Sequence, residues 1–352
     1  MDHEIEERVK KAIHERVTPN AVIGYALPDG QQHVMAFGRN TYEVGSPEVR
    51  ADLLYDVASI TKSIPTSSII LWLIDQKRLG FNDRVREFLP DFDGQYSDEV
   101  TIYHLLTYTA ILDLKEAGLS TYAERGIKEL RRALLHSGLK SRPGGEYWYT
   151  NAPAILLGMV AEKIFQKRLN EIAEELFFGP LGMTRTTFTP EQFKLSEIVP
   201  SEMDEDGFVQ GKSTDEAARV FLENGQPTGV AGLFSTAGDL LTFAQMMVNG
   251  GEYEGHRYLS PDIIGQLRTN QVAELGESTG LGWEIGRPYM GRFRDRLFGK
   301  GGFTGCSVVM DPEKKQAIVV MASYLYPKRR GLYDRGPINQ FRGDLADIVF
   351  RT

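Results

Sequence analysis

The order of strand-like and helix-like segments constrains this chain more than any other feature. Residues 21–27 and 33–37 have strand character and flank a Pro28-Asp29-Gly30 turn, which predicts a β-hairpin. Residues 82–225 have a mostly helical pattern. Four more strand-like segments follow near the end, namely Gly282 to Ile285, Arg294 to Phe298, Cys306 to Met310 and Ala317 to Ala322. We therefore expect one antiparallel sheet built from both termini, flanked by helices, with a helical lobe inserted.

Helices are predicted at both ends of the chain and in its first third. Apolar side chains recur at helical spacing from Glu4 to Val17, and the chain closes with a helical pattern from Asn339 to Phe350. A further helix is expected from near Ser59 past Ile74. These elements predict an α/β (α+β) fold. Its sheet lobe would comprise residues 1–80 and 226–352, its helical lobe residues 81–225, and the active site would lie between the lobes.

The composition narrows the possible partners. Of the 352 residues, 41% are hydrophobic and 25% charged, which excludes a disordered or fibrous chain. The net charge of −8 provides no overall field to attract nucleic acid or an anionic membrane. The apolar run from Ile69 to Ile74 is far shorter than the roughly 20 residues that span a bilayer. We expect a small-molecule substrate, no nucleic acid and no membrane span, and the oligomeric state stays open.

Cysteine, histidine and the first residues give three further expectations. A single cysteine, Cys306, excludes an intramolecular disulfide. The six histidines are scattered and include no pair at i,i+4, so we expect neither a metal nor a cofactor. Residues 1–8 are charged and lack the apolar core of a signal peptide. We expect a cytoplasmic protein, or an exported one if this N-terminus is a trimmed one.

Three short motifs offer a candidate nucleophilic serine. Gly276 to Gly280 matches G-x-S-x-G, but that motif needs a strand before Ser278 and a helix after it, with a later histidine. Its flanks are polar, and no histidine follows His256. Two other segments, Ser59 to Lys62 and Ser137 to Lys140, both match S-x-x-K.

Context favours Ser59 over Ser137. Ser59 opens the strongly apolar predicted helix, so Ser59 and Lys62 should lie side by side on one face. The helix N-terminus would place partial positive charge near Ser59, where it favours a developing oxyanion. Ser137 instead leads into a Gly-rich loop. Taken alone, this motif favours an ordinary N-cap role for Ser59 over a catalytic one.

Two more motifs follow in order: Tyr149-Thr150-Asn151, and Lys300-Gly301-Gly302 at the end of a predicted strand. With Ser59 to Lys62, they give a sequence that resembles the serine β-lactamase and penicillin-binding protein superfamily, specifically its class C-like and esterase branch. The resemblance spans nearly the whole chain. It extends to Leu105–Thr109, Leu156–Met159, Pro180–Thr184, Ala231–Leu240 and Phe298–Gly305.

This chain departs from the family pattern at two places. The usual Leu-Leu-Thr-His-Thr-Ser-Gly-Leu becomes Leu105 to Leu112, where Tyr108 to Ile111 lose a His, a Ser and a Gly. The effect of this change stays open. The middle Thr of the third motif is Gly301, and this change bears on the substrate.

The resemblance implies a β-lactamase/transpeptidase-like fold and a set of roles. Ser59 would be the nucleophile, and it needs a base beside it. The candidate bases are Lys62 and Tyr149. The ordinary pKa of each side chain is near 10, so this pKa must be lowered before the side chain can act as a base near neutral pH. Lys62 and Lys300 would both lower the pKa of the Tyr149 phenol.

The remaining roles concern substrate binding. Asn151 would hydrogen-bond Lys62 and the substrate's acyl oxygen. The backbone N–H groups of Ser59 and Phe303 would form an oxyanion hole, worth about 3 kcal/mol per donor. Lys300, Gly301 and Gly302 would complete the substrate-binding set.

Three functions follow. The first is a serine acyl-hydrolase that works through an acyl-enzyme on Ser59 and leans towards small esters or amides, because Gly301 lacks the hydroxyl that helps bind a carboxylate. The second is a D-Ala-D-Ala carboxypeptidase or class C-like β-lactamase. The third is an acyl acceptor or penicillin sensor that reacts only once. One fold hosts many substrates, so the sequence does not decide between them.

Overall fold

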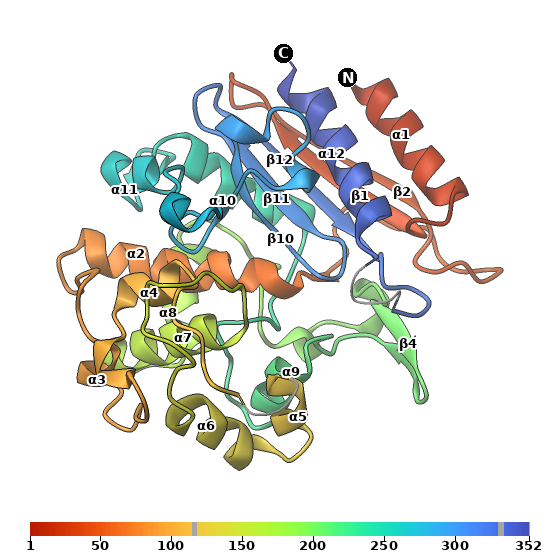
Figure 1. The fold of residues 1–352 in the computed structure, drawn as a ribbon. Coiled ribbons are helices and arrows are strands. Elements are labelled where there is room, and N and C mark those ends of the chain that lie inside the picture. Colours follow the sequence, from red (N-terminus) through yellow and green to blue (C-terminus); the bar gives the residue numbers. More distant parts are fainter. Residues whose placement is uncertain (115–117, 330–333, 352) are drawn as a thin grey trace.

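A computed structural model describes residues 1–114, 118–329 and 334–351, and its central element is one antiparallel sheet (Figure 1). The strand order is β2-β1-β12-β11-β10-β9, so the first hairpin pairs with the last strand of the chain. The predicted sheet from both termini is therefore confirmed. The strands are β1 Asn20–Ala26, β2 Gln32–Gly38, β9 Glu284–Ile285, β10 Phe298–Gly301, β11 Ser307–Asp311 and β12 Gln316–Ala322.

Helices cover both faces of this sheet. On one face lie α1 (Asp2–His14) and α12 (Gly336–Phe350), and on the other lies α10 (Ala237–Val248) (Figure 1). Strand β1 shows why both faces are covered: Ala21, Ile23 and Tyr25 join the apolar cluster with α12, while Val22 and Ala26 join the cluster with α10. Successive strand side chains point to opposite faces, so this strand is buried on both sides.

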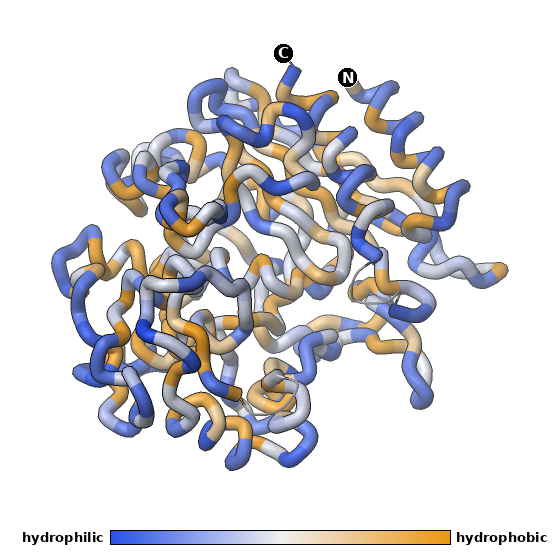
Figure 2. The backbone as a smooth tube through the Cα atoms, viewed as in Figure 1, coloured by the Kyte–Doolittle hydropathy of each residue, from blue (hydrophilic) through white to orange (hydrophobic). Residues whose placement is uncertain are grey.

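The regular elements of residues 82–225, a stretch predicted to be helical, are mainly helices joined by long loops, and the apolar core of this stretch continues into the α10 side of the sheet. Figure 2 shows the hydrophobic residues concentrated on the inner strands and helices, with hydrophilic residues on the outer turns. The proposed lobe boundaries stay a prediction. The remaining helices are α2 Ser68–Asp75, α3 Val85–Phe88, α4 Ile102–Leu106, α5 Leu119–Ala123, α6 Ile127–His136, α7 Ala152–Phe165, α8 Leu169–Ala173, α9 Glu216–Glu223 and α11 Pro261–Gln266.

Short two-stranded pairs and single turns complete the described fold. The pairs are β3 (Tyr55–Asp56) with β6 (Phe234–Ser235), β4 (Glu202–Asp204) with β5 (Gly207–Val209), and β7 (Glu252–Tyr253) with β8 (His256–Arg257). None of the helices in the described ranges combines the length and the apolar character needed to cross a membrane.

The prediction of one continuous helix from Ser59 past Ile74 is wrong. A 3-10 helix, Ala58–Lys62, is followed by a π-type turn, Ser63–Ser67, and only then by α2. Within that turn, Ile64 has the non-helical angles φ −114° and ψ 107°. The cause is Pro65, because the residue before a proline is driven out of the α region. The partial positive charge expected near Ser59 from the N-terminus of a long helix is therefore limited to the contribution of one short 3-10 helix.

The predicted strand from Arg294 to Phe298 is also wrong in its bounds. Arg294–Arg296 forms a 3-10 turn, and β10 begins only at Phe298. Strand β10 lies between β9 and β11, where its first three residues are buried. Burying the three consecutive charged side chains of residues 294–296 in such a position would be unfavourable, so these residues precede the strand.

Candidate active site

Ser59 and Lys62 meet through the 3-10 geometry of residues 58–62. Side chains at i and i+3 eclipse each other in such a helix, and Lys62 Nζ lies 2.8 Å from Ser59 Oγ. The ammonium group also donates to the carbonyl oxygen of Val230 at 3.2 Å. Lys62 is completely buried, and burial lowers the pKa of its ammonium group. The two residues are thus adjacent, as the motif predicts, although the helix is of another kind.

Tyr149 stands between two lysine ammonium groups. It lies just ahead of α7, with Lys300 Nζ 4.3 Å and Lys62 Nζ 5.5 Å from the centre of its ring. Tyr149 is about one third exposed (37%), and the part that is removed from water would raise the pKa of the phenol, but Lys300 and Lys62 outweigh this effect and hold that pKa below its ordinary value. Its hydroxyl interacts with Ser59. This is the environment that a tyrosine base beside Ser59 requires.

Lys300 has a partner that the sequence reasoning missed. Its Nζ lies 3.1 Å from Oε1 of Glu284. The other carboxylate oxygen, Oε2, accepts the hydroxyl of Tyr289 at 2.6 Å and the backbone N–H of Gly301 at 3.3 Å. Burial would raise the pKa of Glu284, but Lys300 outweighs it and lowers that pKa to about 2. Burial would lower the pKa of Lys300, and Glu284 in turn raises it above its ordinary range. The available signal was a charged residue inside the predicted strand Gly282 to Ile285.

The two glycines of the third motif lie against specific neighbours. A Cβ on Gly302 would lie 2.5 Å from the carbonyl oxygen of Val57, so only glycine lets this segment come so close to the one that carries Ser59. A Cβ on Gly301 would lie 3.1 Å from Cε1 of Tyr289. The ring of Tyr289 therefore fills the space that a threonine side chain would begin to occupy.

Asn151 does not make the expected hydrogen bond to Lys62. Its Nδ2 donates to Oδ2 of Asp215 at 2.8 Å instead. An ammonium group and an amide N–H are both donors, so the carboxylate is the better partner for this side of the amide. Asp215 is a second residue of the site that the motifs did not indicate.

Tyr108, part of the loop that departs from the family pattern, packs against the candidate base. Its ring centre lies 4.9 Å from that of Tyr149 and 5.6 Å from Lys300 Nζ. Its φ of 57° is in the left-handed region, and its carbonyl oxygen accepts the backbone N–H of Trp148. The departing loop thus forms part of the wall behind Tyr149.

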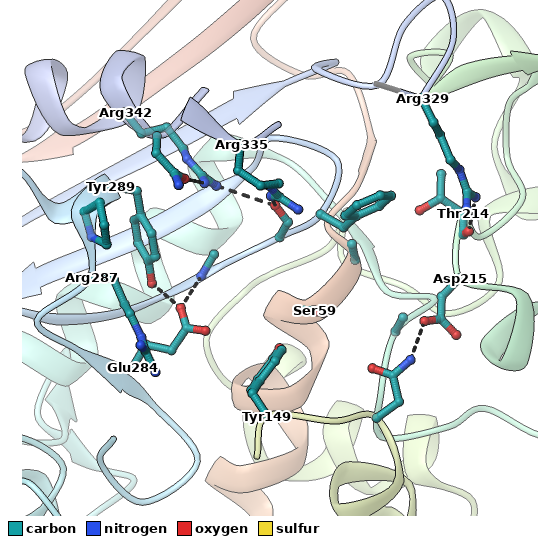
Figure 3. Close-up of a pocket in the computed structure, with 18 of the residues that line it drawn as sticks. Ser59, Tyr149, Thr214, Asp215, Glu284, Arg287, Tyr289, Arg329, Arg335 and Arg342 are labelled. Carbon is teal, nitrogen blue, oxygen red and sulfur yellow. Dashed lines mark hydrogen bonds between the residues drawn. The ribbon is translucent and has the colours of Figure 1, made fainter. Parts of the chain in front are cut away.

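The predicted residues converge on one cavity of about 730 Å³, hereafter the Ser59 cavity (Figure 3). Its walls include six of the predicted residues: Ser59, Tyr149, Asn151, Gly301, Gly302 and Phe303. Lys62 and Lys300 lie buried behind Ser59 and Tyr149. The walls also include charged residues that were not predicted: Asp215, Glu216, Glu284, Arg287, Arg329, Arg335 and Arg342.

The competing serines lie elsewhere. Ser137 caps the end of α6, and Ser278 lies in a loop where its hydroxyl donates weakly to the carbonyl oxygen of Ile285 at 3.4 Å. Neither residue lines the Ser59 cavity. Within the described ranges, no group of three or more His, Cys, Asp or Glu side chains could hold a metal ion.

The fold, and the Ser-x-x-Lys motif that lies at the Ser59 cavity, define the class of protein as a serine hydrolase. The sequence profile of the Beta-lactamase family matches residues 5–340, and the chain belongs to this family. The resemblance seen in the three motifs is thereby confirmed. Among curated relatives, the "Putative D-alanyl-D-alanine carboxypeptidase" of Escherichia coli K12 is 26% identical over 304 residues, which cover 77% of this chain and 69% of that protein.

Solved structures share the fold. A penicillin-binding protein homologue from Pyrococcus abyssi, described as octameric, has a TM-score of 0.72 at 24% identity, covering 92% of this chain and 74% of its own. EstCE1, described as a hydrolase with promiscuous acyltransferase activity, has a TM-score of 0.75 at 20% identity, covering 98% of both chains. These likenesses confirm the β-lactamase/transpeptidase-like fold.

Proposed function

We propose that this hydrolase acts on small esters or amides through an acyl-enzyme on Ser59. Tyr149, as the phenolate, takes the proton of Ser59 Oγ while that oxygen attacks the substrate carbonyl carbon. The backbone N–H groups of Ser59 and Phe303 stabilise the oxyanion. The bond to the leaving group then breaks, and Tyr149 returns the proton to that group. Water, activated in the same way, releases the acyl group and restores Ser59.

Lys62 assists this proton transfer through its contact with Ser59 and through its positive charge. Its Nζ lies 2.8 Å from Ser59 Oγ, and its charge favours the phenolate form of Tyr149. The buried lysine therefore lowers the pKa of the base and orients the nucleophile at once. Asn151, which lines the cavity and is held by Asp215, would bind the acyl amide or ester oxygen of the substrate.

The observation that carries the preference for neutral substrates is the pairing of Lys300 with Glu284. A cation that is already neutralised by a partly buried carboxylate attracts a substrate carboxylate less strongly. Gly301 adds no hydroxyl at this position, and the ring of Tyr289 occupies the adjacent space. Both features favour an uncharged ester or amide beside Lys300.

A D-Ala-D-Ala carboxypeptidase is the second candidate, and two arginines favour it. Arg335 Nη2 donates to the carbonyl oxygen of Gly302 at 3.0 Å, and Arg342 Nη1 donates to that of Cys306 at 2.8 Å, on the wall of the Ser59 cavity. These acceptors are neutral, so both guanidinium groups leave positive charge available for a substrate carboxylate. The name of the Escherichia coli relative points the same way.

The test compares kcat/KM for p-nitrophenyl acetate, p-nitrophenyl butyrate, nitrocefin and a D-Ala-D-Ala peptide. We expect the two esters to be turned over most efficiently, with repeated turnover rather than a single burst. Higher efficiency on the peptide would replace the ester proposal with the carboxypeptidase, and higher efficiency on nitrocefin would replace it with a class C-like β-lactamase. A burst of one acyl equivalent without further turnover would identify a single-reaction acyl acceptor. The Ser59→Ala variant controls for background hydrolysis.

A further inference from the structure

Asp56 is a buried carboxylate just ahead of Ser59 that the proposed mechanism does not use. It ends β3, its side chain is 1% exposed, and it is not part of the wall of the Ser59 cavity. In the described parts of the chain its carboxylate is bound by N–H and O–H donors, and no ion pair joins it to a cation. Burying a carboxylate in this way is unfavourable, so its contacts call for an explanation.

One carboxylate oxygen fixes the backbone next to the nucleophile. Asp56 Oδ1 accepts the backbone N–H of Ala58 at 2.8 Å. Ala58 has a φ of 47°, in the left-handed region that residues with a side chain avoid. Such a conformation persists only where surrounding contacts determine it. Because Ser59 is the next residue, this hydrogen bond helps to fix the direction of the chain between the end of β3 and Ser59.

The other carboxylate oxygen holds the segment that positions Asn151. Asp56 Oδ2 accepts both the backbone N–H and the hydroxyl of Thr214, at 2.8 and 2.9 Å. The next residue, Asp215, accepts the hydrogen bond from Asn151 Nδ2. Figure 3 shows Thr214 and Asp215 on the same side of the Ser59 cavity. Asp56 is thereby linked to Asn151 through two consecutive residues.

The backbone of Asp56 contacts a third segment. Its carbonyl oxygen accepts the hydroxyl of Thr304 at 2.8 Å and the thiol of Cys306 at 3.8 Å. Thr304 directly follows Phe303, whose N–H is the proposed second donor of the oxyanion hole. Asp56 therefore contacts the segment that carries Ser59, the segment that holds Asn151 through Asp215, and the segment that carries Phe303.

We propose that Asp56 is a positioning residue that sets the relative placement of Ser59, Asn151 and Phe303. This inference rests on the proposed acyl-enzyme function, because only that function requires the three groups to converge on one substrate carbonyl. Asp56 acts through other residues and touches no substrate. Displacing a reacting group by about 1 Å can slow a reaction about 100-fold, so loosening this junction should affect the chemical step.

The first test is Asp56→Asn, which keeps the volume of the side chain. An amide has one accepting oxygen and one donating nitrogen, so it can accept from Ala58 or from Thr214 but not from both. We expect phosphonylation of Ser59 by a fluorophosphonate, and kcat for p-nitrophenyl acetate, to fall about 10- to 100-fold. KM should change less than about threefold, because no substrate contact is removed. Thr214→Val, which removes one donor, should show a smaller loss in the same constants, and Thr214→Ser should recover most of it.

Asp311→Asn is the matched control. Asp311 is also a fully buried aspartate, and it accepts from Arg296 and from the backbone N–H groups of Glu313 and Lys314 at the end of β11. We expect its loss to lower thermal stability without changing the phosphonylation rate constant of the folded protein. This readout separates positioning from stability.

The outcomes are distinct. A wild-type phosphonylation rate in folded Asp56→Asn would overturn the inference. Should that variant not fold, equal rates in wild type and Thr214→Val would overturn it instead. If wild type itself is not labelled at Ser59, the proposed function fails, whatever the variants do.

Discussion

Lys300, which is buried, and Glu284, which is partly buried on the cavity wall, form an ion pair with Nζ 3.1 Å from Oε1. The pair lies directly beside Tyr149, whose ring centre is 4.3 Å from the same Nζ. Lys300 lowers the pKa of the Tyr149 phenol and Glu284 raises it. The carboxylate therefore moderates a lysine that would otherwise favour the phenolate more strongly. The pH at which the site becomes active should depend on this balance.

Glu284→Gln should make the site active at lower pH. Removing the negative charge leaves Lys300 and Lys62 unopposed, so the pKa of Tyr149 falls further and more phenolate is present at a given pH. The rise of kcat/KM with pH for p-nitrophenyl acetate should move towards acid. Lys300→Met should move the same rise towards alkali. Glu216→Gln is the control, since Glu216 lines the Ser59 cavity but pairs with Arg329. If the rise of kcat/KM with pH moved in the same direction in Glu284→Gln and Lys300→Met, the opposing effects of these two residues on the pKa of Tyr149 would be contradicted.

The same ion pair should contribute stability that depends on pH. The pKa of Glu284 is about 2 in the folded chain, below its ordinary value of 4.5. Its contribution is therefore fully present above pH 4.5 and is lost as the pH falls from 4.5 towards 2. At pH 7, Glu284→Gln should reduce the free energy of unfolding by about 3–5 kcal/mol, because Lys300 stays buried without its partner. Urea unfolding should show this difference shrinking below pH 4.5, and a constant difference would contradict the ion pair's role.

Tyr149 and Lys62 should behave as one unit in proton transfer. Groups that act together have effects that do not add when they are removed. Tyr149→Phe, Lys62→Ala and the double variant should therefore retain similar residual kcat values on p-nitrophenyl butyrate. A double variant whose loss equals the product of the two single losses would indicate two independent bases. Circular dichroism of each variant checks that the fold is kept.

Tyr289 should decide whether a threonine at position 301 can work. Gly301→Thr alone brings a Cβ to 3.1 Å from the Tyr289 ring, and we expect it to lower stability by about 1–3 kcal/mol. In a Tyr289→Ala background, the added threonine has room to place its hydroxyl beside Lys300. That double variant should gain roughly 10- to 150-fold in kcat/KM for nitrocefin over Tyr289→Ala, the range expected for one hydrogen bond to a charged group. An unchanged rate would show that position 301 does not select carboxylated substrates.

Sequence reasoning could reach the elements whose signals are local. The hairpin of β1 and β2, the helix α12 and the motif residues Ser59 and Lys62 all follow from spacing and side-chain type. The interruption of the predicted helix at Ile64 also has a local signal, namely Pro65. The apolar run from Ile69 to Ile74 nevertheless favours the prediction of one continuous helix.

The rest depends on residues far apart in the chain. Glu284 acquires its role only because β9 and β10 are neighbours in the sheet, which brings it to Lys300. Asp215 becomes part of the site only through Asn151, 64 residues earlier in the sequence. In the sequence, Gly301 in place of threonine indicates only the loss of a hydroxyl group. The structure adds that the ring of Tyr289 lies where the threonine side chain would begin. Such pairings are set by tertiary packing, which no short motif records.

The role of Ser59 as the nucleophile is tested most directly by intact-mass and peptide analysis of wild-type protein after reaction with a fluorophosphonate. We expect a single adduct, located on the peptide that contains Ser59, and no adduct in Ser59→Ala. The peptides containing Ser137 and Ser278 should remain unmodified. An adduct on Ser278, or labelling that persists in folded Ser59→Ala, would contradict the assignment of Ser59 as the nucleophile.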